Sequence, residues 1–126
     1  MTLHSAKAFS KFVLTLPAVT IVAQWESQVA KVGGKVFALC GDDGGHITFK
    51  VSELSFEGLT ALAGIGQAPY FAKRQWVSVG REAAMGDADL KAYLRASHGI
   101  VVAKLTRTLR AELGLTEPGE APPRKP

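Results

Sequence analysis

The N-terminal segment has the hydrophobic spacing of an amphipathic helix. Its apolar side chains recur at intervals of three and four residues, at Phe9, Phe12, Val13 and Leu16. The polar side chains fall on the opposite face, at His4, Lys7, Lys11 and Thr15. The pattern predicts a helix from about residue 2 or 3 to Leu16. It should end there because Pro17 disfavours the α conformation of the residue before it.

A secretory signal is the alternative interpretation of this segment, because Lys7 and Lys11 precede an apolar run over residues 12–23. Pro17 interrupts the run, and Ile21 stands where cleavage after residue 23 requires a small side chain. The helical spacing therefore favours a helix packed on a core. No stretch reaches the ~18 uninterrupted apolar residues of a membrane span, so we expect no membrane partner.

Alternating and β-branched stretches follow, and they predict an antiparallel meander. The expected strands cover residues 20–25, 28–32, 35–40, 47–51 and 75–79. Gly33 and Gly34 form a two-residue link that suits a hairpin turn with positive φ at both positions. Residues 41–45 form a second turn.

Helical patterns cover much of the remaining sequence. A short helix is expected over residues 53–62, and residues 65–73 are expected to form a loop. The last long helix should begin with Asp87 as its N-cap. Its core stripe consists of Leu90, Leu94, Val101 and Leu105. Thr106 is expected to cap a final short helix that ends at residue 113.

These elements predict an α+β fold with two layers, an antiparallel sheet of about five strands covered by N- and C-terminal helices. A chain of 126 residues, 47% of them apolar, is large enough for one core, so we expect a single domain over residues 1–113. Residues 114–126 are rich in proline and should be disordered. The single cysteine fits a reducing compartment and a cytoplasmic location.

The net charge of +4 arises within one third of the chain. Residues 73–113 carry eight bases and four acids, whereas acids and bases balance in the remainder. Such an asymmetry is typical of a polyanion-binding face, although a net charge also serves solubility. Lys104, Arg107 and Arg110 recur at three-residue steps and would share one face if the helix stayed continuous.

Residues 70–76 combine bases with aromatics, since Lys73 and Arg74 lie beside Tyr70, Phe71 and Trp76. Bases can hold phosphates, and aromatic rings can stack on nucleobases. The alternative is that the aromatics belong to the core and that the two bases lie on a solvated turn.

Catalytic and metal-binding motifs have no support in the sequence, so we expect neither an enzyme nor a cofactor. The Gly64-Ile65-Gly66 stretch lacks the third glycine of a dinucleotide fingerprint. Cys40 and His46 flank a turn, but two ligands do not make a metal site, and Cys40 is expected to be a small buried hydrophobe.

Several blocks of the sequence resemble the MmcQ/YjbR family of small bacterial proteins. They are residues 31–39, 70–79, 97–105 and 109–113, and the likeness extends over roughly residues 5–113. The resemblance implies a frataxin-like α+β domain and DNA binding by analogy with a double-wing arrangement. The positions that carry over are Lys35, Phe37, Lys73, Arg74, Trp76 and Lys104.

The sequence also departs from what the resemblance implies. Family members often carry an aromatic residue followed by glycine before the hairpin and a further aromatic nearby, where this chain has Trp25-Glu26 and Ala30. Frataxin-type iron binding relies on an acidic first helix, but this one carries Lys7 and Lys11. We therefore expect no metal.

The leading hypothesis is weak, largely sequence-independent binding of double-stranded DNA. The expected phosphate contacts are Lys35, Lys73, Arg74, Lys104, Arg107 and Arg110. The alternative is a protein- or small-ligand-binding module whose charge serves only solubility. It would use a pocket between the sheet and the helices, near Trp25 and Tyr70.

Overall fold

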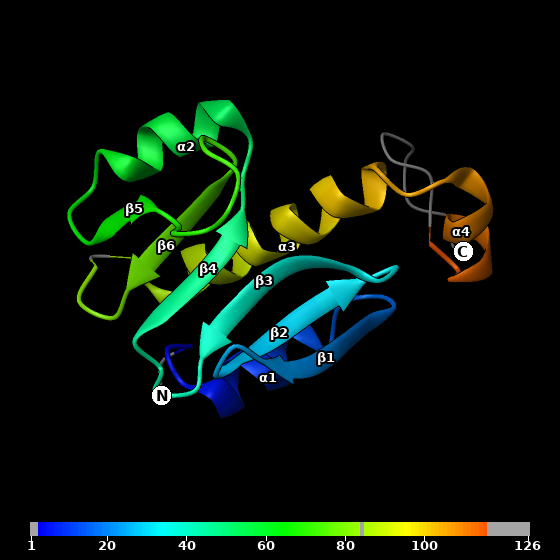
Figure 1. The fold of residues 1–126 in the computed structure, drawn as a ribbon, viewed down its shortest axis with the longest axis horizontal. Helices are drawn as coiled ribbons and strands as arrows, with labels where there is room; N and C mark the ends of the chain where they lie inside the picture. Colours follow the sequence, from blue (N-terminus) through cyan, green and yellow to red (C-terminus); the bar gives the residue numbers. More distant parts are fainter. Residues whose placement is uncertain (1–2, 84, 116–126) are drawn as a thin grey trace.

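The structure is a computed structural model that describes residues 3–83 and 85–115. Its centre is a six-stranded antiparallel sheet with the strand order β1-β2-β3-β4-β6-β5 (Figure 1). The strands are β1 (Val19–Gln24), β2 (Ser27–Val32), β3 (Lys35–Gly41), β4 (His46–Lys50), β5 (Ile65–Gln67) and β6 (Trp76–Gly80). The helices are α1 (Ala6–Val13), α2 (Glu53–Thr60), α3 (Asp87–Ala103) and α4 (Arg107–Glu112).

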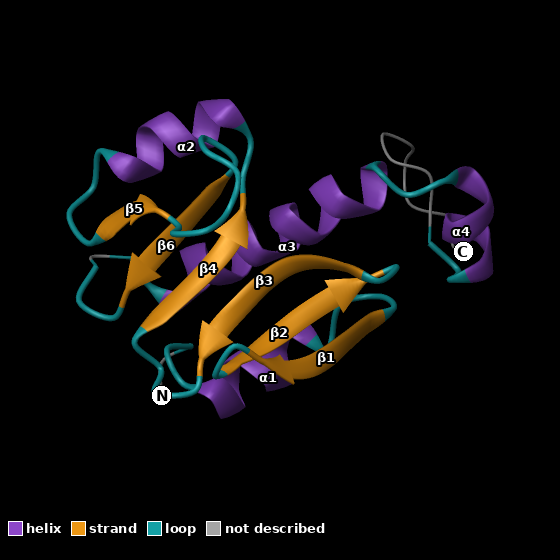
Figure 2. Ribbon diagram, in the orientation of Figure 1, coloured by secondary structure: helices purple, strands orange, loops and turns teal. Residues whose placement is uncertain are grey.

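Two helices cover one face of the sheet. α3 packs on β3 and β4, and α1 packs on β2 and β3, so both lie behind the sheet in Figure 2. α2 contacts β5 and β6 instead, at the other end of the strand order. α4 follows the far end of α3 (Figure 1). The predicted α+β class is confirmed, with helices from both ends of the chain on the sheet.

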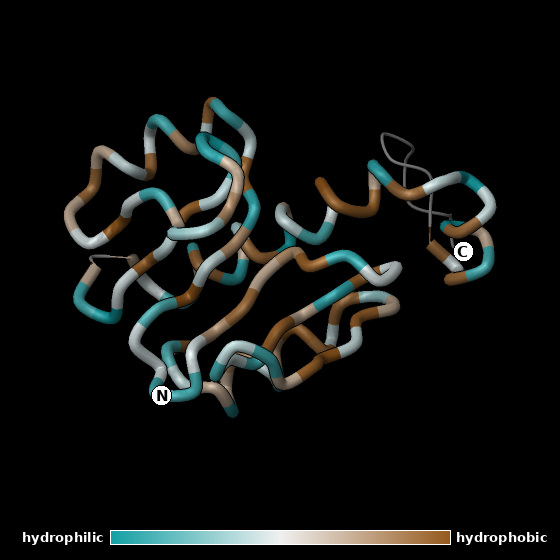
Figure 3. The backbone as a smooth tube through the Cα atoms, in the orientation of Figure 1, coloured by the Kyte–Doolittle hydropathy of each residue, from teal (hydrophilic) through white to brown (hydrophobic). Residues whose placement is uncertain are grey.

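The hydrophobic core lies between the sheet and these two helices. Its largest fully buried side chains include Phe9 of α1, Phe37 and Phe49 of the strands, and Leu90 and Leu94 of α3. Phe49 stacks on Tyr93 of α3 with ring centres 5.8 Å apart. Hydrophobic positions recur along the central strands in Figure 3, where the hydrophilic ones gather in several turns.

The opposite face of the sheet, which we call the open face, turns away from α1 and α3. Because Phe49 points at α3, its neighbours Thr48 and Lys50 point to the open face. The strand register places one residue from each strand in a single row across this face: Val22, Val29, Leu39, Thr48, Ser78 and Gly66. Trp76, two residues before Ser78 and paired with Lys50, belongs to the same face.

Helix-capping residues and a glycine turn set several element boundaries at the positions expected from the sequence. Ser5 caps α1 by accepting a hydrogen bond from the Ala8 amide, so the predicted N-terminal helix is confirmed in a shorter form. Gly33 and Gly34 have φ of +61° and +80°, which confirms the predicted hairpin turn. Thr106 caps α4 by accepting from the Leu109 amide at 3.1 Å.

Two expectations were wrong in detail. Residues 65–67 form a strand rather than a loop, so the sheet has six strands instead of about five. This strand is too short to show alternation, and it acquires its conformation by pairing with β6. Gly86 is the N-cap of α3, and Asp87 begins the helix, with its carboxylate accepting a hydrogen bond from the Leu3 amide at 3.1 Å.

Most of the predicted proline-rich tail, from residue 116 on, lies outside the described residues. Gly114, with φ of +74°, and Leu115 follow α4 and end the described part of the chain. In residues 3–83 and 85–115, no helix combines the length and apolar character needed to cross a membrane.

Candidate nucleic-acid interface

Three lysines from distant parts of the chain lie near the contact between the β2–β3 hairpin and the C-terminal end of α3. Lys35 begins β3, Lys50 ends β4, and Lys104 follows α3. The pKa of Lys50 is lowered, first by burial of its ammonium and then by the positive charges of Lys104 and Lys35. We call these three residues the lysine cluster. Like charges this close create a local positive potential that attracts anions.

Packing against α3 and against Leu105, which follows it, holds the lysine cluster together. At Gly33, a Cβ would lie 2.8 Å from the δ carbons of Leu105, so the hairpin tip rests directly on this leucine. This contact brings Lys35 towards Lys104. The Ser97 hydroxyl of α3 donates a hydrogen bond to the Lys50 carbonyl, which anchors the end of β4 on the same helix.

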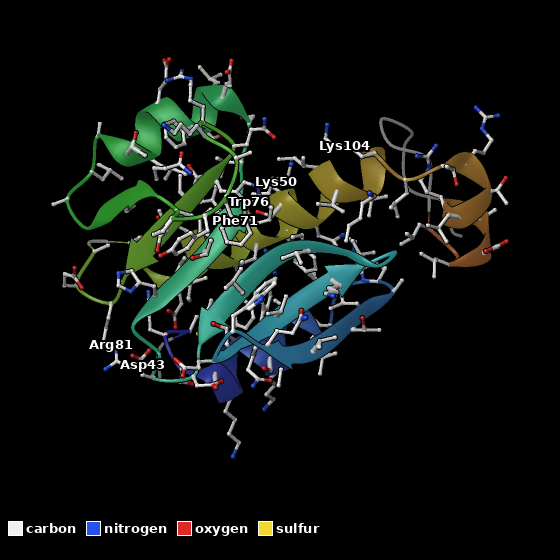
Figure 4. All side chains as sticks on the ribbon, viewed as in Figure 1. Asp43, Lys50, Phe71, Trp76, Arg81 and Lys104 are labelled. Carbon is white, nitrogen blue, oxygen red and sulfur yellow. The ribbon has the colours of Figure 1, made fainter. Side chains whose placement is uncertain are left out.

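An indole ring lies beside the Lys50 ammonium. The Nζ atom of Lys50 lies 5.5 Å from the Trp76 ring centre and donates a hydrogen bond to Gln75 Oε1 at 3.3 Å. The Phe71 ring packs on the Trp76 indole, with ring centres 4.4 Å apart and an interplanar angle of 33°. Figure 4 shows Lys50, Trp76 and Phe71 close together, with Lys104 beyond them.

The loop between β5 and β6, residues 68–75, is organised by one amide side chain. Gln67 Nε2 donates to the carbonyls of Ala68, at 2.8 Å, and Phe71, at 3.3 Å. Gln67 Oε1 accepts from the Arg74 amide at 2.9 Å. The loop is therefore held in one conformation, in which Tyr70 and Arg74 have positive φ.

This loop and the β1–β2 turn form the walls of a recess on the open face. Trp25, Tyr70 and Phe71 line a cavity of about 480 Å³, which we call the aromatic recess. The Trp25 side chain is 64% exposed and Tyr70 is fully exposed. A neighbouring cavity of about 480 Å³ shares Tyr70 and includes the polar side chains of His46, Thr48, Gln67 and Ser78. The pocket expected near Trp25 and Tyr70 thus lies on the open face, not between the sheet and the helices.

Arg74 is exposed but already has anionic partners. Its guanidinium forms ion pairs with Glu57 and Glu53 of α2 and lies 5.6 Å from the Phe56 ring centre. The hydrogen bond to Glu57 is the main reason that the pKa of Arg74 is raised. These two carboxylates neutralise the positive charge of Arg74, which the sequence analysis expected to contact a DNA phosphate.

Arg110 is buried rather than exposed, which differs from the expected phosphate contact. Its guanidinium donates hydrogen bonds to the carbonyls of Val102, in the last turn of α3, and of Leu105, just after the helix. The helical conformation is interrupted between α3 and α4, at residues 104–106. Lys104, Arg107 and Arg110 therefore do not lie on one continuous helix. Arg110 closes this junction instead.

The remaining bases of residues 73–113 are dispersed over the molecule. Lys73 is exposed in the loop 68–75, and Arg107 is exposed at the start of α4. Lys91 and Arg95 of α3 flank the Phe12 ring, on the helix-covered side. Arg81 donates to the carbonyls of Asp43 and His4, beside the β3–β4 turn (Figure 4). The basic third of the sequence is therefore not a single surface.

Sequence reasoning missed Lys50 because it lies outside that basic third. Alternation from Ile47 to Val51 placed its side chain on a solvated face, but gave no reason to associate it with Lys35 or Lys104. The only available signal was its adjacency in the meander to a strand that carries Trp76.

The structure offers no activated thiol. Cys40 is fully buried, as expected, and burial with the nearby Asp43 and Asp42 raises its pKa from 9.0 to about 11. Cys40 pairs with Ile47 and faces the core, whereas the adjacent His46 lines the open face. Across residues 3–83 and 85–115, no three His, Cys, Asp or Glu side chains gather in a metal-binding arrangement.

The fold and sequence match known proteins. A crystal structure of a Deinococcus radiodurans protein with a DUF419 domain is 26% identical, covers 93% of both chains and has a TM-score of 0.80. A crystal structure of a Pseudomonas syringae protein is 18% identical and has a TM-score of 0.60 over 72% of this chain and 93% of that one, so it supports the fold alone. No curated protein matches the sequence. The family model for YjbR matches residues 14–100, and the chain therefore belongs to the YjbR family.

Proposed function

We propose that the protein binds double-stranded DNA weakly and largely without sequence preference, through the lysine cluster. The observation that carries this proposal is that the hairpin before Lys35 packs on Leu105, next to Lys104, while Ser97 of α3 anchors the Lys50 backbone. A bound phosphate relieves the repulsion between these ammonium groups, so complex formation has a direct electrostatic driving force.

The lysine cluster is available to an external anion. In the part of the chain that the structure describes, the ion pairs are those of Arg74, and none involves the three lysines. Lys73 and Arg107 are exposed, and we propose them as secondary phosphate contacts. Arg74 and Arg110 are excluded, because each already has the partners described above.

The proposed role is that of a non-enzymatic binding protein in the cytoplasm, without a cofactor or metal. The buried Cys40 with a raised pKa supports the absence of thiol chemistry. The proposal includes no target sequence.

The test is a fluorescence-anisotropy titration of a labelled random-sequence duplex at several salt concentrations. Neutralising three phosphates gives a slope of about −2.7 for log K against log salt, and removing one lysine changes it by about one unit. Lys50→Gln and Lys104→Gln should each weaken binding. Lys11→Gln, which removes the same charge from α1, should not. Binding that is absent at low salt, or equally weakened by all three substitutions, would refute the proposal.

A protein- or small-ligand-binding module remains the second candidate. It is favoured by the exposed Trp25 and Tyr70, which a duplex bound at the lysine cluster does not require. Such a module would bind its partner without the salt dependence described above.

A further inference from the structure

The aromatic recess combines two features that are uncommon in surface side chains. Trp25 and Tyr70 are large, exposed and held in the left-handed region, with φ of +53° and +70°. A bulky residue adopts this region at an energetic cost, and such residues concentrate at binding sites. The two rings approach the same recess from different segments, the β1–β2 turn and the loop 68–75.

Both walls of the recess are fixed before any ligand binds. The β1–β2 turn is tied down by the Asp42 amide, which donates to the Glu26 carbonyl at 3.0 Å, and by the Ser27 hydroxyl, which donates to the Trp25 carbonyl at 3.2 Å. Gln67 organises the other wall, as described above. Preorganised walls reduce the conformational entropy lost on binding.

The recess is also connected to the lysine cluster. Phe71, which lines the recess, packs on Trp76, and Lys50 lies 5.5 Å from the Trp76 ring centre on the same face. On the other side, the neighbouring cavity offers the hydrogen-bonding groups of His46, Thr48 and Ser78. The open face thus presents, in this spatial order, the Lys50 ammonium, the flat aromatic rings and the polar groups.

This order matches the chemistry of a nucleotide whose base is unpaired. A phosphate is attracted by ammonium groups, a base stacks on an aromatic ring, and the edge of the base forms hydrogen bonds. A base in a duplex has both of its faces and its pairing edge occupied, and it enters a pocket only if it is flipped out.

We propose that the aromatic recess binds an unpaired nucleobase of a strand whose phosphates lie on the lysine cluster, so that single-stranded nucleic acid binds more tightly than duplex. This inference rests on the phosphate binding proposed above. It assigns Trp25 and Tyr70 to base stacking, Lys50 to the adjacent phosphate, and Gln67 to the positioning of the loop 68–75.

The test compares three labelled oligonucleotides of equal length by fluorescence anisotropy: oligothymidylate, a strand of abasic sites, and a duplex. The abasic strand retains the phosphates and lacks the bases. Oligothymidylate should bind more tightly than both of the others. Trp25→Ala and Tyr70→Ala should each weaken its binding by about fivefold or more, and leave binding of the abasic strand unchanged. Tyr70→Phe, which keeps the ring, should bind as the wild type does.

A matched control removes a large exposed apolar side chain elsewhere. Leu54 of α2 is 84% exposed, and Leu54→Ala should not change any of the three affinities. Thermal unfolding of each variant establishes that a loss of binding is not a loss of fold.

The outcomes separate this inference from the proposed function. If none of the three oligonucleotides binds, the lysine-cluster proposal itself fails. If all three bind alike and the Trp25→Ala and Tyr70→Ala proteins are unaffected, phosphate binding stands and the base-binding inference is overturned. Competition by free thymidine monophosphate as effective as that by oligothymidylate would assign the recess to a free nucleotide and overturn the preference for a strand.

Discussion

The ammonium of Lys50 lies 5.5 Å from the centre of the Trp76 ring, its cross-strand partner in the register of β4 and β6. This pair connects the lysine cluster with the aromatic recess, because Lys50 belongs to the cluster and Trp76 packs on Phe71 of the recess. A cation over an aromatic face is stabilised by the ring quadrupole, and this attraction offsets part of the repulsion from Lys35 and Lys104.

The Lys50 ammonium should titrate below the ordinary lysine pKa of 10.5. Burial of Lys50 is the first cause and the charges of Lys104 and Lys35 are the second, so Lys104→Gln should raise the pKa of Lys50 towards 10.5. Lys11→Gln on the helix-covered side should leave it unchanged. The measurement is an NMR titration of the lysine side chains at low salt. A Lys50 midpoint that is equal in the wild type and in Lys104→Gln would contradict the assignment of the cluster.

The same shift predicts the sign of a stability change with pH. Because the pKa of Lys50 is lower in the folded state than in the unfolded state, its protonated form opposes folding. This cost is fully present below the folded-state pKa, and it disappears as the pH rises through that value towards 10.5. The free energy of unfolding of the wild type, relative to Lys50→Gln, should therefore increase over this pH window in urea denaturation.

Arg110 should matter for stability rather than for binding. Its guanidinium donates to the carbonyls of Val102 and Leu105, and Arg110→Ala leaves these groups without their donor. We expect a loss of about 1–3 kcal/mol in the free energy of unfolding. Lys73→Ala, at an exposed loop position, should change it by less than about 0.5 kcal/mol. Urea denaturation checks both values, and equal stability of the two variants would show that Arg110 does not hold the junction.

The Cys40 thiol should be unreactive in the folded protein. Burial, together with Asp43 and Asp42, raises its pKa from 9.0 to about 11, so very little thiolate is present near neutral pH. A neutral thiol favours the folded state, and this contribution is complete below pH 9.0 and lost as the pH rises through about 11. Labelling by an aromatic disulfide reagent should be slow in buffer and rapid in urea. Rapid labelling in buffer would place Cys40 in an accessible position.

Local sequence signals were sufficient for the elements that have local causes. The β2–β3 hairpin depends on two adjacent glycines with positive φ, and α4 begins at a threonine that caps its own helix. Strand β5 has no such signal, since its three residues are extended because they pair with β6. Periodicity cannot detect a strand whose stability comes from its partner.

The candidate site was predicted only in part, for a similar reason. Lys35 and Lys104 follow from the sequence resemblance, but Lys50 joins them through the packing of the hairpin and β4 on α3. Arg110 resembled a surface base, because its spacing from Lys104 and Arg107 suggests one helix face. The capping signal at Thr106 already contradicted that continuity. Charge counting along the sequence therefore could not distinguish the exposed bases of the C-terminal third from Arg74 and Arg110, whose guanidinium groups bind other parts of the protein.

The contact between the hairpin and α3 can be tested with a pair of glycine substitutions. Gly33 and Gly34 both have positive φ, so alanine at either position costs about 1 kcal/mol in backbone strain. At Gly33 the new Cβ also meets the δ carbons of Leu105, whereas at Gly34 it meets nothing within 4 Å. Gly33→Ala should therefore destabilise the protein more than Gly34→Ala, by about a further 1 kcal/mol, because Leu105 or the hairpin must shift. In the Leu105→Ala background the two glycine substitutions should have equal effects on the free energy of unfolding. If the difference between them persisted without Leu105, the hairpin would not rest on this residue.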